Sequence, residues 1–316
     1  MPETDQVQYS IVVPIYRNAD GITALLEALD SLNLHTGQFE VVFVVDGSPD
    51  DSFDRLKSGL NGCSFEWQLL ELSRNFGSFT AIRQGLGCAQ GRYFAVMAAD
   101  LQEPPELLVQ FFELLRADRA DVVVGVRSGR DDPALTSWTS QVFWRIYRLL
   151  VMKEMPVGGV DVFGCNLLFR DALLSLHEKN SFLIGQLFWV GFRRAEVGYR
   201  RRARQTGRSA WTLWRRLDYM FDAVFAFSDL PIKLLMFIGV FGILLALGVA
   251  ASVGIAWMLG WIAVKGYAPI MLSIAFFGSL LTLGQGILGY YIWRIAEDTK
   301  QRPSGFVLRH LKRGTD

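Results

Sequence analysis

Two long stretches without a charged side chain, near the carboxyl end of the chain, most constrain how this sequence can fold. The first covers residues 234–264 and the second residues 266–293. Each exceeds the roughly 20 apolar residues that an α-helix needs to cross a bilayer. We therefore expect two transmembrane helices, at 233–262 and 268–293, joined by a very short turn. This pattern excludes a purely soluble protein and a transporter with many spans.

Basic residues flank these stretches on their outer sides. Lys265 is the only basic residue between them, whereas many precede the first stretch and follow the second: Arg200, Arg201, Arg202, Arg204, Arg208, Arg215, Arg216 and Lys233, then Arg294, Lys300, Arg302, Arg309, Lys312 and Arg313. Cytoplasmic flanks carry the excess of Lys and Arg, so both chain ends are expected in the cytoplasm. The net charge of only +1 argues against nucleic acid as the main partner.

The residues before the first stretch alternate between strand and helix patterns. Apolar runs predict strands at 9–13, 39–45, 67–72, 93–98 and 122–126, the first of them ending at Pro14. Apolar residues at helical spacing predict helices at 21–34, 51–60, 78–89 and 104–116. This order predicts an α/β fold with a doubly wound, mostly parallel sheet, which binds ligands at the carboxyl ends of its strands.

The composition predicts four parts along the chain. Residues 1–207 form the α/β domain, and residues 208–230 an amphipathic juxtamembrane helix that lies in the headgroup plane. Residues 231–294 contain the two transmembrane helices. Residues 295–316 form a basic cytoplasmic tail.

Five motifs occur in a familiar order: Val13-Pro14-Ile15-Tyr16-Arg17-Asn18, Val45-Asp46-Gly47-Ser48, Ser73-Arg74-Asn75-Phe76-Gly77, Asp100-Leu101-Gln102-Glu103-Pro104-Pro105 and Arg204-Gln205-Thr206-Gly207-Arg208-Ser209. Together with the hairpin, they resemble the polyprenyl-phosphate glycosyltransferases of glycosyltransferase family 2, which have the Rossmann-like GT-A fold. That group includes dolichyl-phosphate mannose synthase and the bactoprenol glucosyltransferases of O-antigen modification.

The resemblance implies an activity and a location. A sugar would pass, with inversion, from a nucleoside-diphosphate sugar to polyprenyl (undecaprenyl) phosphate, and a uridine nucleotide is implied. The product would serve cell-envelope glycan modification such as that of lipopolysaccharide. The enzyme would lie in the bacterial inner membrane with its catalytic domain in the cytoplasm. Relatives of the bactoprenol branch form oligomers, which leaves a homotetramer open.

The resemblance also implies the donor residues. Pro14, Tyr16 and Asn18 would frame the nucleobase and ribose, and Asp46 would hydrogen-bond the base or ribose. Asn75 would complete this nucleotide-sugar site. The alternative for Asp46 and Asn75 is a turn-forming role at a strand end.

Asp100 and Gln102 resemble the second Asp and the Gln of the family's Asp-x-Asp-x-Gln metal motif, so Asp100 is expected at the metal, at the donor and in catalysis. Their oxygens suit Mg²⁺ or Mn²⁺. The first Asp of the motif is replaced by Ala98, which is expected to weaken metal binding or to leave more of the metal ligation to water and phosphate oxygens. The alternative role for Asp100 is an N-cap ahead of the helix that follows.

Acceptor residues follow from the same resemblance. Asp161 resembles the acceptor-side aspartate, with positioning as its first role and proton acceptance as its second; its alternative is a loop aspartate. Guanidinium groups match phosphate oxygens. The candidates for phosphate or acceptor binding are Arg127, Arg130, Arg204, Arg208 and Ser209. Ala210 stands where relatives often carry Lys, and residues 200–202 are expected to contact anionic headgroups.

Two other functions remain open at this point. Gln205-Thr206-Gly207-Arg208 partly matches the Gln-x-x-Arg-Trp motif of processive polysaccharide synthases, but Ser209 replaces the Trp. Two spans per chain also cannot enclose a polymer channel unless several chains combine. A catalytically inactive membrane scaffold is the other alternative, and Ala98 and Ala210 are the residues that favour it.

Overall fold

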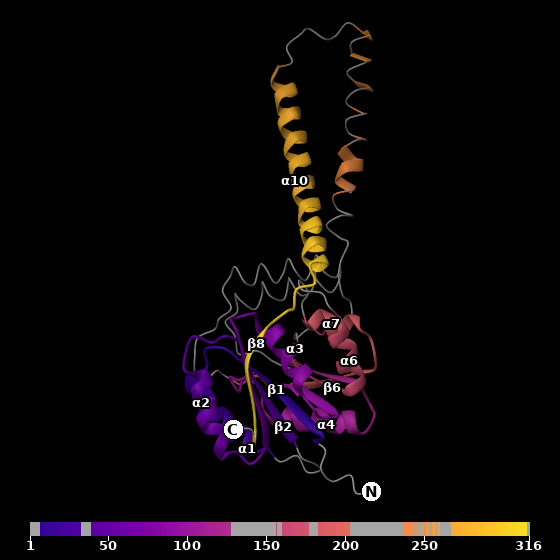
Figure 1. Ribbon diagram of the computed structural model, residues 1–316. Coiled ribbons are helices and arrows are strands. Elements are labelled where there is room, and N and C mark those ends of the chain that lie inside the picture. Colours follow the sequence, from indigo (N-terminus) through magenta and orange to yellow (C-terminus); the bar gives the residue numbers. More distant parts are fainter. Residues whose placement is uncertain are drawn as a thin grey trace.

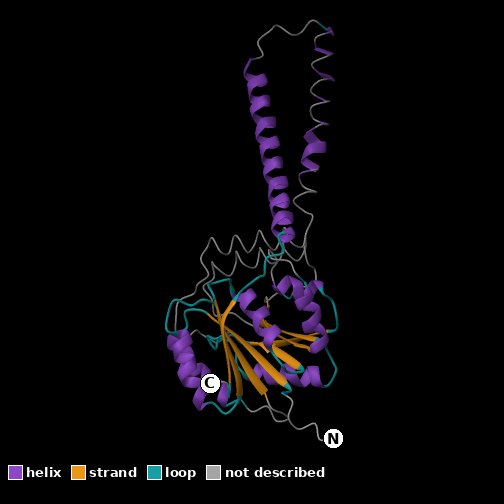
Figure 2. Cartoon of the chain, viewed as in Figure 1, coloured by secondary structure: helices purple, strands orange, loops and turns teal. Residues whose placement is uncertain are grey.

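An α/β domain built on one mixed sheet carries most of the described chain. The computed structural model describes residues 7–32, 39–127, 156, 160–176, 183–202 and 267–314, together with scattered positions between 235 and 259. Within these residues the sheet has eight strands in the order β7-β5-β6-β4-β1-β2-β3-β8. Figure 2 shows the sheet with helices on both sides.

The strands and helices have the following bounds. The strands are β1 (Tyr9–Ile15), β2 (Phe39–Val45), β3 (Glu66–Leu72), β4 (Tyr93–Val96), β5 (Val122–Arg127), β6 (Val160–Asn166), β7 (Arg194–Tyr199) and β8 (Val307–Lys312). The helices are α1 (Ile22–Asp30), α2 (Ser52–Gly59), α3 (Ser78–Cys88), α4 (Glu106–Arg116), α6 (Leu167–Ser175), α7 (Leu183–Trp189) and α10 (Tyr267–Thr299), with 3-10 turns η1 (Ala19–Gly21) and η2 (Leu60–Gly62).

The sheet is mostly parallel, as the alternating sequence pattern predicts. β1 pairs in parallel with β2 and with β4, β2 with β3, and β5 with β7. Two strands run the other way: β6 lies antiparallel between β4 and β5, and β8 lies antiparallel against β3. The prediction of an α/β fold with a mostly parallel sheet is therefore confirmed.

Two apolar cores lie on opposite faces of the sheet. α1, α2 and α4 bury their apolar residues on one face, including Leu25, Leu56 and Phe111. α3, α6 and α7 cover the other face, with Leu86 and Phe169 among the buried side chains. Because both faces are covered, the central strands are apolar along their whole length, which explains the continuous run at 39–45.

The first strand does not end at Pro14, as its sequence predicts, but continues to Ile15. The Ile15 carbonyl accepts from the Asp46 amide on the β2 side, whereas the Val12 carbonyl accepts from the Met97 amide on the β4 side. Backbone hydrogen bonds to the two neighbouring strands alternate from residue to residue along β1, so the backbone N of Pro14 faces β4. The β1–β4 pairing ends at Val12 and Val96, and the missing N–H of Pro14 therefore costs no ladder bond.

Part of the predicted basic tail is a strand of the sheet. β8 pairs with β3 from Gln68 opposite Lys312 to Leu72 opposite Val307. It comes directly after α10, which rises away from the α/β domain in Figure 1, and it brings the chain back to the edge of the sheet. The carboxyl end of the chain is thus an integral part of the α/β domain.

The predicted membrane spans are not confirmed by the described residues. α10 covers the second predicted span and extends to Thr299. Among the residues that the structure describes, no helix is both long enough and apolar enough to cross a bilayer. Part of the first predicted span, at 233–262, and the whole juxtamembrane segment 208–230 lie outside these residues.

A buried carboxylate links three strands on the amino side of the sheet. Glu40 of β2 is 3% exposed and accepts hydrogen bonds from the Ser10 hydroxyl (2.7 Å), the Gln90 amide (2.5 Å) and Gln68 Nε2 (2.8 Å). Gln68 Oε1 in turn lies 2.8 Å from His310 Nε2 of β8. Because buried polar groups are costly when unpaired, this network fixes the register of β8 on β3.

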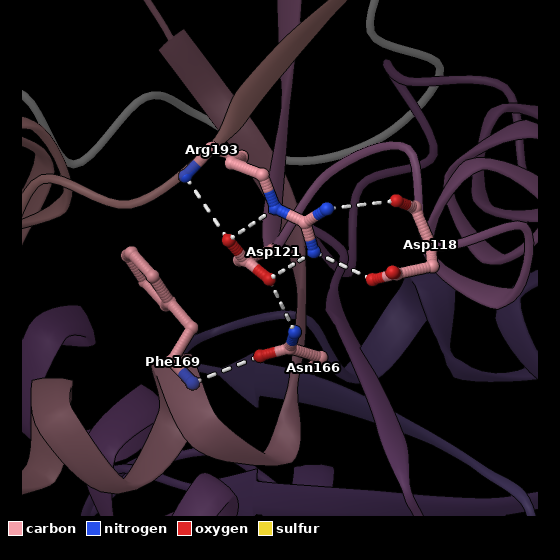
Figure 3. Close-up of polar contacts among 5 residues, drawn as sticks. All are labelled: Asp118, Asp121, Asn166, Phe169 and Arg193. Carbon is pink, nitrogen blue, oxygen red and sulfur yellow. Dashed lines mark hydrogen bonds and ion pairs between the residues drawn. The ribbon is translucent and has the colours of Figure 1, made fainter.

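A second polar cluster joins β5, β6 and the chain before β7 (Figure 3). Asp121 accepts from Arg193 Nε (3.0 Å), from Arg193 Nη2 (2.9 Å) and from Asn166 Nδ2 (2.9 Å). Asn166 caps α6 by accepting from the Phe169 amide (2.9 Å), and Arg193 also pairs with Asp118. The hydrogen bonds from Arg193 lower the pKa of Asp121 despite its burial.

Replacing Asp121 is expected to remove a stability contribution that depends on pH. The pKa of Asp121 is lower in the folded than in the unfolded chain, so its contribution is present above the unfolded value, about 4, and is lost as pH falls through the folded value. Asp121→Asn should therefore cost about 1–2 kcal/mol of unfolding free energy at pH 7 and a smaller amount near pH 3. Urea unfolding of the purified protein at both pH values measures this difference.

Asp171→Asn is the matched control, because Asp171 is an exposed partner of the neighbouring Arg170. It should change stability little at either pH. An equal loss for Asp121→Asn at pH 7 and pH 3 would contradict the account of this cluster.

Candidate active site

Four loops that follow β1, β2, β3 and β4 meet at one edge of the sheet. These strands are parallel neighbours, so their carboxyl ends lie together. We call the loop segments 16–18, 46–50, 74–77 and 98–102 the carboxyl edge. Each segment contains residues that the sequence motifs single out, and the structure brings those motifs together.

Asp46 joins the loop after β2 to the loop after β3. Its side chain is buried, at 2% exposure, and its two oxygens accept from the amides of Phe76 (2.7 Å) and Gly77 (2.8 Å). Burial raises the pKa of the Asp46 carboxyl, whereas the two amides and the charge of Arg74 act in the opposite direction. Asp46 therefore joins two loops that are distant in sequence, and its expected contact with the base or ribose stays a prediction.

Gly47 allows the same two loops to approach each other closely. Its φ is +52°, in the left-handed region, and a Cβ there would lie 2.1 Å from the carbonyl carbon of Arg74. Any side chain would collide with backbone, which cannot move aside as a flexible side chain does. Glycine is thus required at this position.

A second aspartate, which the motif reading does not single out, joins the loops after β1 and β2. Asp50 accepts from the hydroxyls of Ser48 (2.6 Å) and Ser52 (2.7 Å) and from the Ala19 amide (3.1 Å). Burial acts to raise the pKa of Asp50, but these hydrogen bonds prevail and lower it. The signal that could have found Asp50 is its place just before a predicted helix, where short polar residues cap.

Hydrogen bonds join the loop after β1 to the loops after β2 and β4. The Arg17 amide donates to Ser48 Oγ (2.8 Å), and Asn18 Nδ2 donates to the Ala99 carbonyl (3.0 Å) in the loop after β4. Tyr16 and Pro14 are half-buried, and the Arg17 guanidinium lies 5.4 Å from the centre of the Tyr16 ring. Tyr16 and Asn18 therefore lie in the carboxyl edge, and Pro14 lies in β1 just before it.

Asn75 is half-buried in the loop after β3. Its carbonyl accepts from Arg74 Nη1 (3.2 Å), and the Arg74 guanidinium lies over the Phe76 ring at 4.1 Å from its centre. The loop thus places a cation and an amide side chain at the carboxyl edge.

The expected metal motif forms a tight turn after β4. Gln102 N donates to Asp100 Oδ1 (3.3 Å), and Leu101 has a positive φ of 52°. Asp100 does not cap α4, because the N-cap residue of that helix is Pro105. The N-cap alternative for Asp100 is therefore wrong.

Residues 200–202 lie against this turn, which the sequence does not reveal. Arg201 Nη2 donates to Gln102 Oε1 (2.6 Å), and the Arg202 amide donates to the Gln102 carbonyl (2.8 Å). Arg201 also pairs with the buried Glu103 at 3.5 Å, and Arg202 with Glu106 at 3.6 Å. These arginines make contacts within the protein, in addition to any contact with headgroups.

Among the described residues of the carboxyl edge, the oxygen atoms suit a divalent ion that also binds substrate phosphates. Asp100 provides one half-buried carboxylate, Ala98 provides none, and the Gln102 oxygen faces the Arg201 guanidinium. In the part of the chain that the structure describes, no three His, Cys, Asp or Glu residues cluster in a way that could hold a metal. Mg²⁺ commonly uses one or two carboxylates with substrate phosphates and water, and Asp100 fits that pattern.

The expected acceptor residues are only partly described. Arg127 ends β5 and is half-buried, and Asp161 lies near the start of β6, where Val160 pairs with Val126. Because β6 runs antiparallel, this backbone position belongs to the same edge as Asp100. The Asp161 side chain and the remaining candidates, Arg130, Arg204, Arg208 and Ser209, lie outside the described residues.

Two surface grooves accompany this arrangement. One of about 380 Å³ borders the metal motif, between α4 and residues 198–202. The other, of about 690 Å³, lies between α1 and α2 and contains none of the residues singled out by the motifs. The carboxyl edge is therefore the candidate site because of its polar motif residues, although the larger groove lies elsewhere.

Known proteins resemble the chain along nearly its whole length. The profile described as "Glycosyl transferase family 2" matches residues 10–176. The prophage bactoprenol glucosyl transferase homolog of Escherichia coli (strain K12) is 30% identical over 320 residues, covering 97% of this chain and 100% of that protein. An undecaprenyl-phosphate 4-deoxy-4-formamido-L-arabinose transferase of Pseudomonas aeruginosa (strain LESB58) is 30% identical over 318 residues, covering 96% and 90%.

A solved structure is similar over part of the chain. The mannosyltransferase PcManGT of Pyrobaculum calidifontis, in complex with GDP-Man and Mn²⁺, is 17% identical, with a TM-score of 0.45 over 63% of this chain and 58% of that one. Family membership rests on the sequence matches and not on this similarity.

Adding a methyl group at Gly47 is expected to displace the loop after β3. Gly47→Ala forces a Cβ against the Arg74 backbone and places alanine at a positive φ, so the Phe76 and Gly77 amides should exchange hydrogen faster. Hydrogen-exchange mass spectrometry of the purified protein measures this.

Gly62→Ala is the control, since a Cβ at Gly62 meets nothing within 4 Å. Exchange in the loop should then equal that of the parent protein. Unchanged exchange in Gly47→Ala would refute the close approach of the two loops.

Proposed function

The chain belongs to glycosyl transferase family 2, and we propose that it transfers a sugar, with inversion, from a nucleoside-diphosphate sugar to polyprenyl phosphate at a membrane surface. The observation that carries this proposal is the carboxyl edge, where hydrogen bonds join four loops around Asp100. As a family 2 glycosyltransferase, the protein is an enzyme of sugar transfer. The donor, the acceptor and the membrane location are the proposed parts.

The donor would lie across the loops after β1, β2 and β3. Tyr16 and Asn75 are half-buried side chains at this edge and suit contacts with the nucleobase and ribose. Both Asp46 oxygens already accept backbone amides, so its contribution is to hold the loop that carries Asn75. Uridine is the nucleotide that the family resemblance favours.

The departing diphosphate needs positive charge. Arg74 is exposed at the carboxyl edge, and Arg201 lies beside Gln102. A bound Mg²⁺ or Mn²⁺ would supply further charge stabilisation, with Asp100 as its protein ligand and Gln102 as a second one if Arg201 turns away. The Gln102–Arg201 contact holds a cation beside the motif in which Ala98 stands in place of the first Asp.

The acceptor is already a good nucleophile. A phosphate monoester, whose second pKa is about 6, is largely dianionic at pH 7, so no strong general base is required. One phosphate oxygen would form the new bond to the anomeric carbon while the bond from that carbon to the diphosphate oxygen breaks on the opposite face. Asp161 would position the acceptor, and Arg127, Arg130, Arg204, Arg208 and Ser209 would bind its phosphate.

The proposed membrane location is supported by the surface of α10. Large apolar side chains along this helix are exposed, and they include Ile270, Leu281 and Ile292, at 60%, 69% and 66%. Soluble proteins rarely expose so long an apolar surface. β8 returns from α10 to the sheet, so the end of α10 and the catalytic domain lie on the same side of the proposed membrane.

A lipid-extraction assay tests the function. Membranes that contain the protein are incubated with a panel of labelled nucleotide sugars and undecaprenyl phosphate, and the product is extracted into organic solvent. We expect label in the lipid phase for one donor. Label in insoluble polymer would instead indicate a polysaccharide synthase, and no label with any donor would indicate an inactive scaffold.

Asp100→Ala is expected to abolish lipid labelling without loss of the protein from membranes, because Asp100 is the proposed carboxylate at the diphosphate. Glu113→Ala, on the exposed face of α4, is the control and should label lipid at the parent rate. Full activity of Asp100→Ala would dismiss the role given to this residue.

Restoring the missing carboxylate is expected to strengthen metal binding. Ala98→Asp adds an anionic oxygen ligand two residues before Asp100, and affinity for hard cations rises with ligand charge. The Mn²⁺ concentration for half-saturation should fall by about an order of magnitude, as measured by electron paramagnetic resonance of free Mn²⁺. The same affinity in Ala98→Asp and the parent would place the ion elsewhere.

A further inference from the structure

We propose that Phe306, in the segment between α10 and β8, is a positioning residue for the donor site. This inference rests on the proposed function, because the loop that Phe306 contacts is the proposed donor loop, residues 74–77. Phe306 follows both predicted spans in the sequence, so a residue after the spans would help to shape the donor site.

β8 is fixed to β3 along its length. Arg309 pairs with Glu71 and lies over the Phe53 ring at 4.0 Å, and His310 contacts Gln68. At the far end, Arg313 Nη1 donates to the carbonyl of Phe65 (2.7 Å). These contacts hold the strand in one register, so the residue just before it has a defined place.

The residues before β8 reach the donor loop. The Ser73 amide, at the start of that loop, donates to the Phe306 carbonyl (2.9 Å). The Phe306 ring then packs against the Phe76 ring, with centres 6.4 Å apart and planes tilted by 51°. The connection from α10 therefore supplies both a backbone and an aromatic contact to the loop.

Close packing brings this connection against the first turn of α3. A Cβ at Gly305 would lie 2.8 Å from Thr80 Cγ2. The connection is short, because α10 ends at Thr299 and Phe306 lies just before β8. After α10 the chain therefore passes the first turn of α3 at Gly305 and reaches the donor loop at Phe306.

Two contacts hold the donor loop from opposite sides. Asp46 binds the Phe76 and Gly77 amides from the β2 side, and Phe306 packs on the Phe76 ring from the β8 side. The Arg74 guanidinium also lies on the Phe76 ring. The position of Phe76 therefore sets where Arg74 and Asn75 lie, and Phe306 fixes that position without touching the substrate.

The test compares Phe306→Ala with Leu308→Ala. Phe306 is 57% exposed and Leu308 is 62% exposed, so neither substitution empties the core. We expect Phe306→Ala to raise the KM for the donor about two- to tenfold, the worth of one aromatic pair, with kcat and the acceptor KM unchanged. UDP binding, measured by titration calorimetry without acceptor, should weaken by the same factor.

Leu308→Ala should match the parent in every measurement, and Phe306→Tyr, which keeps the ring, should restore the donor KM. Wild-type donor KM and UDP affinity in Phe306→Ala would overturn the proposal, as would an equal loss in Leu308→Ala.

Hydrogen exchange separates this inference from the proposed function. Even if the parent protein transfers no sugar, the Phe76 and Gly77 amides should exchange faster in Phe306→Ala than in Leu308→Ala. Equal exchange in the two variants would contradict the inference alone, whereas an inactive parent with faster exchange in Phe306→Ala would contradict the proposed function alone.

Discussion

The arrangement of the candidate site depends on the buried carboxylate of Asp46, whose oxygens accept the backbone amides of the next loop. A carboxylate at 2% exposure is stable only when its oxygens are hydrogen-bonded, and the Phe76 and Gly77 amides provide those bonds. Gly47 lets the two loops come close enough for them to form. Asp50 accepts from the Ala19 amide, and the Asn18 side chain donates to the Ala99 carbonyl, so hydrogen bonds also join the neighbouring loops. The carboxyl edge is therefore fixed before any substrate binds.

The chain beyond the predicted spans belongs to the same structure. β8 is the edge strand next to β3. The residues on either side of β8 contact both ends of β3, because Arg313 donates to the Phe65 carbonyl and the Phe306 carbonyl accepts from the Ser73 amide. A catalytic domain cut off before the spans would lack this strand and the aromatic contact to Phe76. Residues 307–312, which belong to the predicted basic tail, therefore form part of the sheet of the catalytic domain.

The sequence predicts the central strands well because their apolar character is local information. The run at 39–45 coincides with β2, and the predicted helix 104–116 differs from α4 only in its first turn. The sequence does not predict β6, β7 or β8. β8, for example, is largely exposed and carries Arg309 and Lys312 between apolar residues. Nor does local sequence show which loops touch: Arg201 and Gln102 are far apart in the chain, and only the packing of residues 200–202 against the turn after β4 brings them together.

We propose that the donor binds across the carboxyl edge of the sheet. Hydrogen-exchange mass spectrometry of the membrane-bound protein, with and without the saturating nucleotide sugar, tests it most directly. The account predicts slower exchange in segments 16–18, 46–50, 74–77 and 98–102. Unchanged exchange in these segments, or protection confined to the larger groove between α1 and α2, would contradict it.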